Sequence, residues 1–207
     1  MQTLTTEDGQ AISYAFYPSK QGGPGAILLH QLRRDHHDYD SFAPQLKDAG
    51  YNVIAIDVRG HGHSSGNWEK FSLADFQRIG LDIAAAKEFL AEHGTDTSKL
   101  VLIGASFTAN AVINHSANDD DVKGVIAISP GLDFKGIRPE QGIARAPTTL
   151  LIAAEDDSYS ADTVRKLHTL NPDTDIKIYP VGGHAHALFE QAPMAKDILG
   201  WLRVAIK

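Results

Sequence analysis

Short, uninterrupted apolar runs recur along the chain and alternate with segments of helical periodicity. An apolar run without polar alternation is typical of a strand buried on both faces of a parallel sheet. On this basis strands are predicted at residues 26–29, 52–57, 100–103, 122–129, 148–154 and 175–179. Residues 3–17 read instead as two short strands around Asp8-Gly9, a dipeptide suited to a hairpin turn. We therefore expect an antiparallel hairpin at one edge of the sheet.

Apolar residues at helical spacing occupy most intervals between the predicted strands. They predict helices at residues 39–49, 72–93, 107–114, 161–170 (capped by Ser160) and 194–204. Strands that alternate with helices predict an α/β fold, with a mainly parallel twisted sheet and helices on both faces. Residues 130–147 lack strong periodicity and are too few for a separate lid domain. We expect residues 1–207 to form a single domain.

Composition narrows the chemistry that this fold can carry. The chain has no cysteine, which leaves hydroxyl, imidazole and carboxylate groups as the candidate reactive side chains. A formal net charge of −7 argues against nucleic acid or an anionic membrane as the main partner, because both attract basic surfaces. A small molecule that is not polyanionic is the expected partner, and the sequence sets no oligomeric state.

The hydropathy of the chain also bears on its location. No apolar run approaches the roughly 20 residues that span a bilayer, and the first residues lack the regions of a signal peptide. We expect a soluble, cytoplasmic protein; a leader removed before residue 1 would make it periplasmic or secreted.

The segment at residues 100–114 carries the strongest single signal for function. An apolar run stops at Gly104-Ala-Ser106, and a helical pattern begins at once. A serine on such a strand-to-helix turn can project its hydroxyl clear of the sheet as a catalytic nucleophile. The Gly-x-Ser-x-Gly pattern is incomplete, because Thr108 stands where the second glycine would. The alternative is that Ser106 only caps the helix.

Candidate partners for Ser106 follow two later strands. Three candidate acids, Glu155, Asp156 and Asp157, come after the strand at 148–154, and His184 and His186 come after the strand at 175–179. The carboxyl ends of parallel strands meet at one edge of a sheet, where ligands bind. A serine nucleophile needs a base, and the base needs an orienting carboxylate. The order serine, acid, histidine therefore predicts a catalytic triad at this edge.

The chain resembles the α/β-hydrolase family over nearly its whole length, and in particular small lidless bacterial serine hydrolases of the dienelactone hydrolase or carboxylesterase type. The matching motifs, in the family's order, are Leu28-Leu-His30, Asp57-Val-Arg-Gly-His-Gly-His-Ser64, Gly104-Ala-Ser-Phe-Thr108, Ala154-Glu-Asp-Asp157 and Gly183-His184. Ser129-Pro-Gly-Leu-Asp133 is also typical of such proteins.

The resemblance implies a role for each candidate. The family's acid stands three residues beyond the small residue that ends its strand, which selects Asp157, with Asp156 as the alternative. The family's histidine follows a glycine, which selects His184 as the base, with His186 as the alternative. Asp57 and Arg59 are implied to make structural hydrogen bonds.

The oxyanion of acyl transfer needs preorganised N–H donors. One is expected from Phe107, directly after the nucleophile, and the resemblance implies that Leu32 supplies the other. The family usually has glycine after the histidine of this loop, whereas this chain has Gln31. A positive φ at Gln31 would be strained, so we expect a modest change of loop path instead.

Other polar motifs have simpler explanations. His30 is expected to brace the oxyanion loop. Asp35-His-His-Asp38 and His61-Gly-His63 could bind zinc, but the family loop and solvation explain them, so no metal site is predicted. Arg33 and Arg34 would be either exposed or able to attract a substrate carboxylate.

These inferences converge on one hypothesis. The protein is predicted to cleave small carboxylic esters through an acyl-enzyme formed on Ser106, with His184 as base and Asp157 as orienting acid. No cofactor or metal is required by this chemistry. The alternatives are thioester, lactone or amide hydrolysis by the same triad, and a non-catalytic ligand-binding protein on the hydrolase scaffold.

Overall fold

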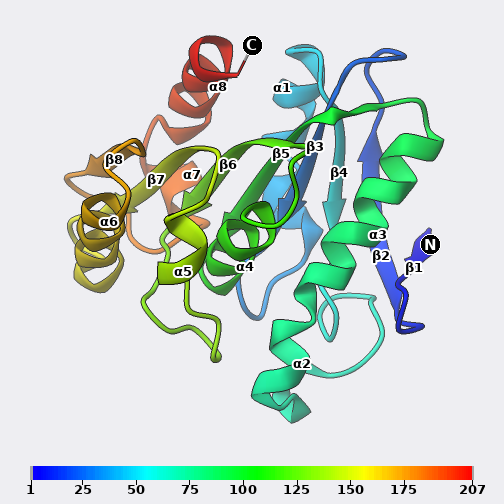
Figure 1. Ribbon diagram of the computed structural model, residues 1–207, viewed down its shortest axis with the longest axis horizontal. Helices are drawn as coiled ribbons and strands as arrows, with labels where there is room; N and C mark the ends of the chain where they lie inside the picture. The colour runs from blue at the N-terminus through cyan, green and yellow to red at the C-terminus, as the bar shows by residue number, and fades with distance from the viewer. Residues whose placement is uncertain (1, 207) are drawn as a thin grey trace.

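A twisted eight-stranded sheet runs through the middle of the computed structural model, which describes residues 2–206 (Figure 1). The strand order is β1-β2-β4-β3-β5-β6-β7-β8. The first two strands pair in antiparallel fashion at one edge, and all strands from β3 onward are parallel, as predicted. Their bounds are β1 Thr3–Thr5, β2 Ala11–Tyr17, β3 Pro24–Leu29, β4 Asn52–Ile56, β5 Asp96–Ala105, β6 Val122–Ile128, β7 Thr148–Ala154 and β8 Asp175–Tyr179.

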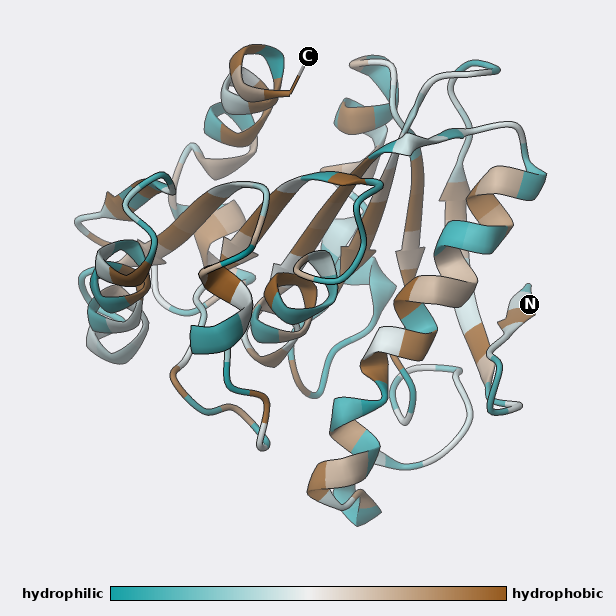
Figure 2. Ribbon diagram, in the orientation of Figure 1, coloured by the Kyte–Doolittle hydropathy of each residue, from teal (hydrophilic) through white to brown (hydrophobic). Residues whose placement is uncertain are grey.

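Helices cover both faces of the sheet, which explains why the central strands are continuously apolar (Figure 2). In the view of Figure 1, one group lies in front of the sheet and the other behind it. The front group is α3 Ile79–Glu92, α4 Phe107–Ser116, α5 Glu140–Ile143 and α6 Ser158–Leu170. The rear group is α1 Ala43–Asp48, α7 Ala187–Gln191 and α8 Met194–Ala205. Each group buries its apolar side chains against its own face of the sheet. Within residues 2–206, every helix is too short or too polar to cross a bilayer.

Two predicted helices differ from the observed ones. The helix predicted at 39–49 begins only at Ala43, because Pro44 lies in its first turn, where a missing N–H is tolerated. A 3₁₀ turn, His36–Tyr39, precedes it. The helix predicted at 72–93 is divided at Arg78 into α2 Leu73–Gln77 and α3. The division lets Phe76 pack against Phe107, with ring centroids 5.9 Å apart.

Three helices near the carboxyl edge of the sheet also differ from the sequence predictions. Helix α6 begins at Ser158 and has Asp157 at its N-cap position, so the prediction of Ser160 as the cap was wrong. The segment 130–147, predicted as a loop, contains α5, and α7 follows His186. Both helices are too short to show periodicity in the sequence.

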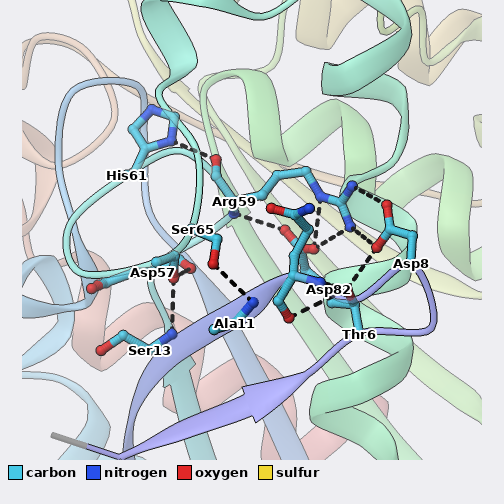
Figure 3. A network of polar contacts seen from close by, with 11 residues as sticks. Thr6, Asp8, Ala11, Ser13, Asp57, Arg59, His61, Ser65 and Asp82 are labelled. Atoms are coloured by element: carbon cyan, nitrogen blue, oxygen red, sulfur yellow. Dashed lines mark hydrogen bonds and ion pairs between the residues drawn. The ribbon is translucent and has the colours of Figure 1, made fainter.

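An ionic network centred on the buried side chains of Arg59 and Asp82 joins the antiparallel hairpin to the rest of the molecule (Figure 3). Arg59, in the loop after β4, donates from Nη1 to Asp8 Oδ2 at 2.8 Å and from Nε to Asp82 Oδ1 at 2.9 Å. The Arg59 guanidinium lowers the pKa of Asp8 to about 2, whereas burial raises the pKa of Asp82 to about 6. Arg59 therefore ties the β1–β2 turn to α3.

Asp57 organises the same loop from inside. Its carboxylate accepts the backbone N–H of His36 at 2.8 Å and that of His63 at 2.9 Å, and it contacts His36 Nδ1 at 2.6 Å. Burial opposes ionisation, but these hydrogen bonds outweigh it and hold the pKa of Asp57 at about 2. Gly62 is required beside it, because a Cβ there would lie 2.2 Å from Asp57 Oδ2.

Candidate active site

Ser106 occupies a sharp turn between β5 and α4. Its backbone has φ 60° and ψ −122°, a conformation that non-glycine residues rarely adopt and that marks functional turns. Gly104 permits this turn, because a Cβ at that position would lie 2.4 Å from the carbonyl oxygen of Thr108. Ser106 stands at the N-cap position of α4, yet its side chain makes no capping hydrogen bond. The structure therefore does not support the alternative in which Ser106 only caps the helix.

One chain of hydrogen bonds joins the three residues predicted from the strand exits. His184 Nε2 lies 2.8 Å from Ser106 Oγ, and His184 Nδ1 lies 2.6 Å from Asp157 Oδ2. With the proton on Nδ1, the ring donates to Asp157, and its Nε2 accepts the Ser106 hydroxyl proton. This is the spacing that a nucleophile, a base and an orienting carboxylate require.

The surroundings of Asp157 favour its charged form. Burial alone would raise the pKa of the carboxyl, but the interactions with His184 and Ser160 together outweigh burial, and the pKa lies below its usual value. The N-terminus of α6, where Asp157 stands, also favours a negative charge. A charged Asp157 can hold one tautomer of His184 and stabilise the imidazolium.

The two alternative residues make other contacts. Asp156 accepts hydrogen bonds from the backbone N–H groups of Gly182 and Gly183, at 3.2 and 3.0 Å. The ring of His186 lies against Asp38, with Nδ1 3.6 Å from Oδ1, and against Glu190. Asp156 thus holds the loop that carries His184 through its backbone amides.

Two further side chains hold this loop and were missed as site residues in the sequence. Ser129, directly after β6, accepts the backbone N–H of Ala185 at 2.9 Å. Gln31, directly after His30, accepts the backbone N–H of His186 at 2.7 Å through Oε1. Ser129 lies in a motif that is recognisable in the sequence. No signal in the sequence pointed to the contact between Gln31 and His186. Backbone amides on both sides of His184 are therefore bound by side chains from other strand exits.

Thr108 replaces the second glycine of the elbow and has a defined role in the fold. Its buried hydroxyl accepts the backbone N–H of Ala105 at 2.8 Å. The same oxygen lies 2.9 Å from the carbonyl oxygen of Leu29 and 3.1 Å from that of His30, to which it can donate. Thr108 thus joins the elbow to the end of β3, where the predicted oxyanion loop begins.

The loop after β3 avoids strain at Gln31, as expected. The backbone N–H of Arg34 donates to the Gln31 carbonyl at 3.3 Å, which closes a turn with Leu32 and Arg33 at its centre. The positive φ falls on Arg33, at 68°, and not on Gln31. The other predicted donor, Phe107, is the first residue of α4, so the helix leaves its N–H without an intrahelical acceptor.

His30 braces this loop from below. Its Nδ1 lies 2.7 Å from the Gln31 carbonyl oxygen, and its Nε2 accepts the backbone N–H of Val58 at 3.0 Å. Burial lowers the pKa of His30 to about 4, so the ring is neutral near pH 7. A neutral ring can donate from Nδ1 and accept at Nε2, which these two contacts require.

The remaining polar motifs are used within the fold. Among residues 2–206 there is no group of three or more side chains placed to hold a metal ion. Arg34 forms an ion pair with Asp38 at 2.5 Å, whereas Arg33 is exposed and lies over the ring of Trp68, 5.4 Å from its centroid. His61 is stacked between Trp68 and Phe107.

Comparison with known proteins gives matches of two kinds. Residues 26–144 match the family model described as serine aminopeptidase, S33. Curated relatives include epoxide hydrolase B of Mycobacterium tuberculosis, 28% identical over 121 residues, and a non-heme chloroperoxidase of Burkholderia pyrrocinia, 30% identical over 127 residues. These matches cover 58% and 61% of this chain but only 32% and 42% of the two relatives.

Solved structures match over nearly the full chain. The Pyrococcus furiosus esterase Pf2001 has a TM-score of 0.81 at 17% identity, with 100% of this chain and 92% of the esterase covered. Est1E of Butyrivibrio proteoclasticus, solved with ferulic acid bound, has a TM-score of 0.82 at 15% identity, with 98% of both chains covered. At this level of identity the likeness concerns the fold.

Proposed function

The chain belongs to the α/β-hydrolase family, and on that premise we propose that it is a serine hydrolase that cleaves small carboxylic esters through an acyl-enzyme. The observation that carries the proposal is the hydrogen-bonded chain from Ser106 through His184 to Asp157. Fold alone would not support it, because related scaffolds host different reactions. The match to esterases is a likeness of fold, and the reacting groups are those of this chain.

The acylation step follows from the geometry. Ser106 Oγ attacks the acyl carbon while His184 Nε2 takes the hydroxyl proton, which gives a tetrahedral oxyanion and an imidazolium stabilised by Asp157. The N–H groups of Phe107 and Leu32 are proposed to bind the oxyanion. When the intermediate collapses, the alkoxy group leaves with the proton from His184, and the acyl group remains on Ser106.

The same residues complete the cycle. His184 takes a proton from a water molecule, and the resulting hydroxide attacks the acyl carbon of the acyl-enzyme. Collapse of the second intermediate returns the proton to Ser106 Oγ and releases the carboxylic acid. The net reaction consumes one water molecule, and all proton transfers pass through His184.

The openness of the site supports small substrates. The side chain of His184 is 38% exposed, so the base is reached directly from solvent, whereas Ser106 is 8% exposed. The segment between β6 and β7 contains the four-residue α5 and a bridge between Phe134 and Ile137. The Phe134 ring stands edge-on to His184 at 6.1 Å and forms part of the wall. Such a site favours short-chain or small water-soluble esters over long lipids.

A fluorophosphonate probe tests the proposal. We expect the probe to label the folded protein at Ser106, and the Ser106→Ala variant to remain unlabelled. Absence of labelling in the folded wild-type protein would contradict the serine mechanism and favour a non-catalytic ligand-binding role.

Turnover assays then identify the bond that is cleaved. We expect the largest kcat/KM for p-nitrophenyl esters of short acyl chains, in a series of graded length. Matched thioester, lactone and aminoacyl anilide substrates serve as comparisons, and faster turnover of any of them would assign the triad to that bond instead.

A further inference from the structure

Gln31 connects two loops that come from opposite ends of the chain. Its side-chain Oε1 accepts the backbone N–H of His186 at 2.7 Å, and the two residues are 155 positions apart in the sequence. Its backbone carbonyl is fixed as well, because it accepts from Arg34 N–H and lies 2.7 Å from His30 Nδ1. Gln31 is thus held at its backbone by the oxyanion loop, and its side chain holds the histidine loop.

We propose that Gln31 is a positioning residue that sets the distance between the oxyanion donors and the catalytic base. This inference rests on the proposed function. Gln31 immediately precedes Leu32, and His186 lies two residues after His184. The hydrogen bond between Gln31 and His186 therefore acts both on the oxyanion loop and on the loop that carries His184. Neither Gln31 nor His186 touches a reacting group.

No second hydrogen bond in the described residues makes this connection. Among the hydrogen bonds of residues 2–206, it alone joins residues 30–34 to residues 182–187. The histidine loop has two other anchors, Asp156 after β7 and Ser129 after β6, and neither belongs to the oxyanion loop that follows β3. The ring of His186 makes a longer contact with the same region. Its Nδ1 lies 3.6 Å from Asp38, the ion-pair partner of Arg34, but it has no hydrogen-bond partner.

Backbone strain beside His184 explains how this hydrogen bond can affect the orientation of the His184 ring. Ala185, between His184 and His186, has a φ of 51°, an unfavourable value for a residue with a Cβ. The hydrogen bonds to Ala185 N–H and His186 N–H hold it in that conformation. Loss of the Gln31 acceptor would allow Ala185 to relax and the His184 ring to turn away from Ser106.

Kinetics of two Gln31 variants test the proposal. Gln31→Met keeps the length of the side chain but has no acceptor for the amide, and Gln31→Glu keeps an acceptor. We expect Gln31→Met to lower kcat about tenfold with little change in KM, because reacting groups displaced by a fraction of an ångström lose rate more than binding. Gln31→Glu should retain kcat within about threefold, since its carboxylate can accept the same N–H.

Asn52 supplies a matched control. Its side-chain Oδ1 also accepts a backbone N–H from another loop, that of Ser19 at 2.8 Å, at the opposite end of the sheet. Asn52→Leu should lower stability and leave kcat unchanged. Equal loss of kcat in Asn52→Leu and Gln31→Met would show a general effect of destabilisation and overturn the inference.

Hydrogen–deuterium exchange provides a readout that needs no turnover. The amide of His186 should exchange about tenfold faster in Gln31→Met than in the wild-type protein, because it loses its acceptor, and should be unchanged in Asn52→Leu. Unchanged exchange in Gln31→Met would overturn the inference whether or not the protein is an esterase. Faster exchange with unchanged kcat would overturn the catalytic consequence alone, and absence of fluorophosphonate labelling in the wild-type protein would instead contradict the proposed function.

Discussion

Replacement of Thr108 by valine tests whether the residue that departs from the elbow pattern stabilises this site. Valine has nearly the shape of threonine, so the change exchanges a hydroxyl for a methyl group and leaves no cavity. The hydroxyl accepts the N–H of Ala105 and lies within 3.1 Å of the carbonyl oxygens of Leu29 and His30. A buried methyl group in that place can neither accept nor donate.

The magnitude follows from those contacts. The N–H of Ala105 would be left buried without its acceptor, which costs about 1–3 kcal/mol, and the lost donation to a carbonyl adds about 1 kcal/mol. We therefore expect Thr108→Val to lower the free energy of unfolding by about 2–4 kcal/mol. Thr108→Ser, which keeps the hydroxyl and loses one methyl group, should cost only about 1 kcal/mol.

Urea denaturation measures both variants. The midpoint should shift while the slope of free energy against urea concentration stays constant, because the surface exposed on unfolding is unchanged. The two variants should also differ in activity. Thr108→Ser should retain a larger kcat than Thr108→Val, because the hydroxyl links the elbow to the strand that leads into the oxyanion loop. A valine variant as stable as the serine variant would refute the reasoning.

Two further predictions concern the base and the response to acid. His184→Ala should abolish turnover of p-nitrophenyl acetate, whereas His186→Ala should retain most of it, because only the His184 ring bonds both Ser106 and Asp157; the reverse result would reassign the base. The pKa of Asp57 is held at about 2, below its usual value of 3.8, so this carboxylate stabilises the folded state above pH 3.8, and that contribution is lost as the pH falls through 2. Between pH 6 and pH 2, the free energy of unfolding should therefore fall by about 2 kcal/mol more in the wild-type protein than in Asp57→Asn. An equal fall in both proteins would contradict the low pKa of Asp57.

The fold and the residues at the strand exits could be predicted from the sequence because they depend on local patterns. Continuous apolar runs give buried strands, and parallel strands bring their carboxyl ends to one edge, which places Ser106, Asp157 and His184 near one another. Helix boundaries were less accurate where a single residue decides them, as at Pro44 and Arg78.

The contacts that hold the histidine loop could not be predicted in the same way. Asp156, Ser129 and Gln31 each bind a backbone amide in a loop distant in sequence, and amides carry no residue-specific pattern. Gln31 stood out only as a departure from the expected glycine. Its partner depends on the three-dimensional path of two irregular loops.

The order in which the chain contributes to the site has a consequence for its synthesis. The turn at Ser106 is complete once β6 has formed beside β5, but His184 lies beyond residue 180, in a loop held by side chains that follow β3, β6 and β7. A nascent chain on the ribosome therefore presents Ser106 without its histidine partner until the loop after β8 has emerged. Under the proposed function, acylation of Ser106 would report that the whole sheet edge has assembled, and an incompletely folded molecule would be inactive towards esters.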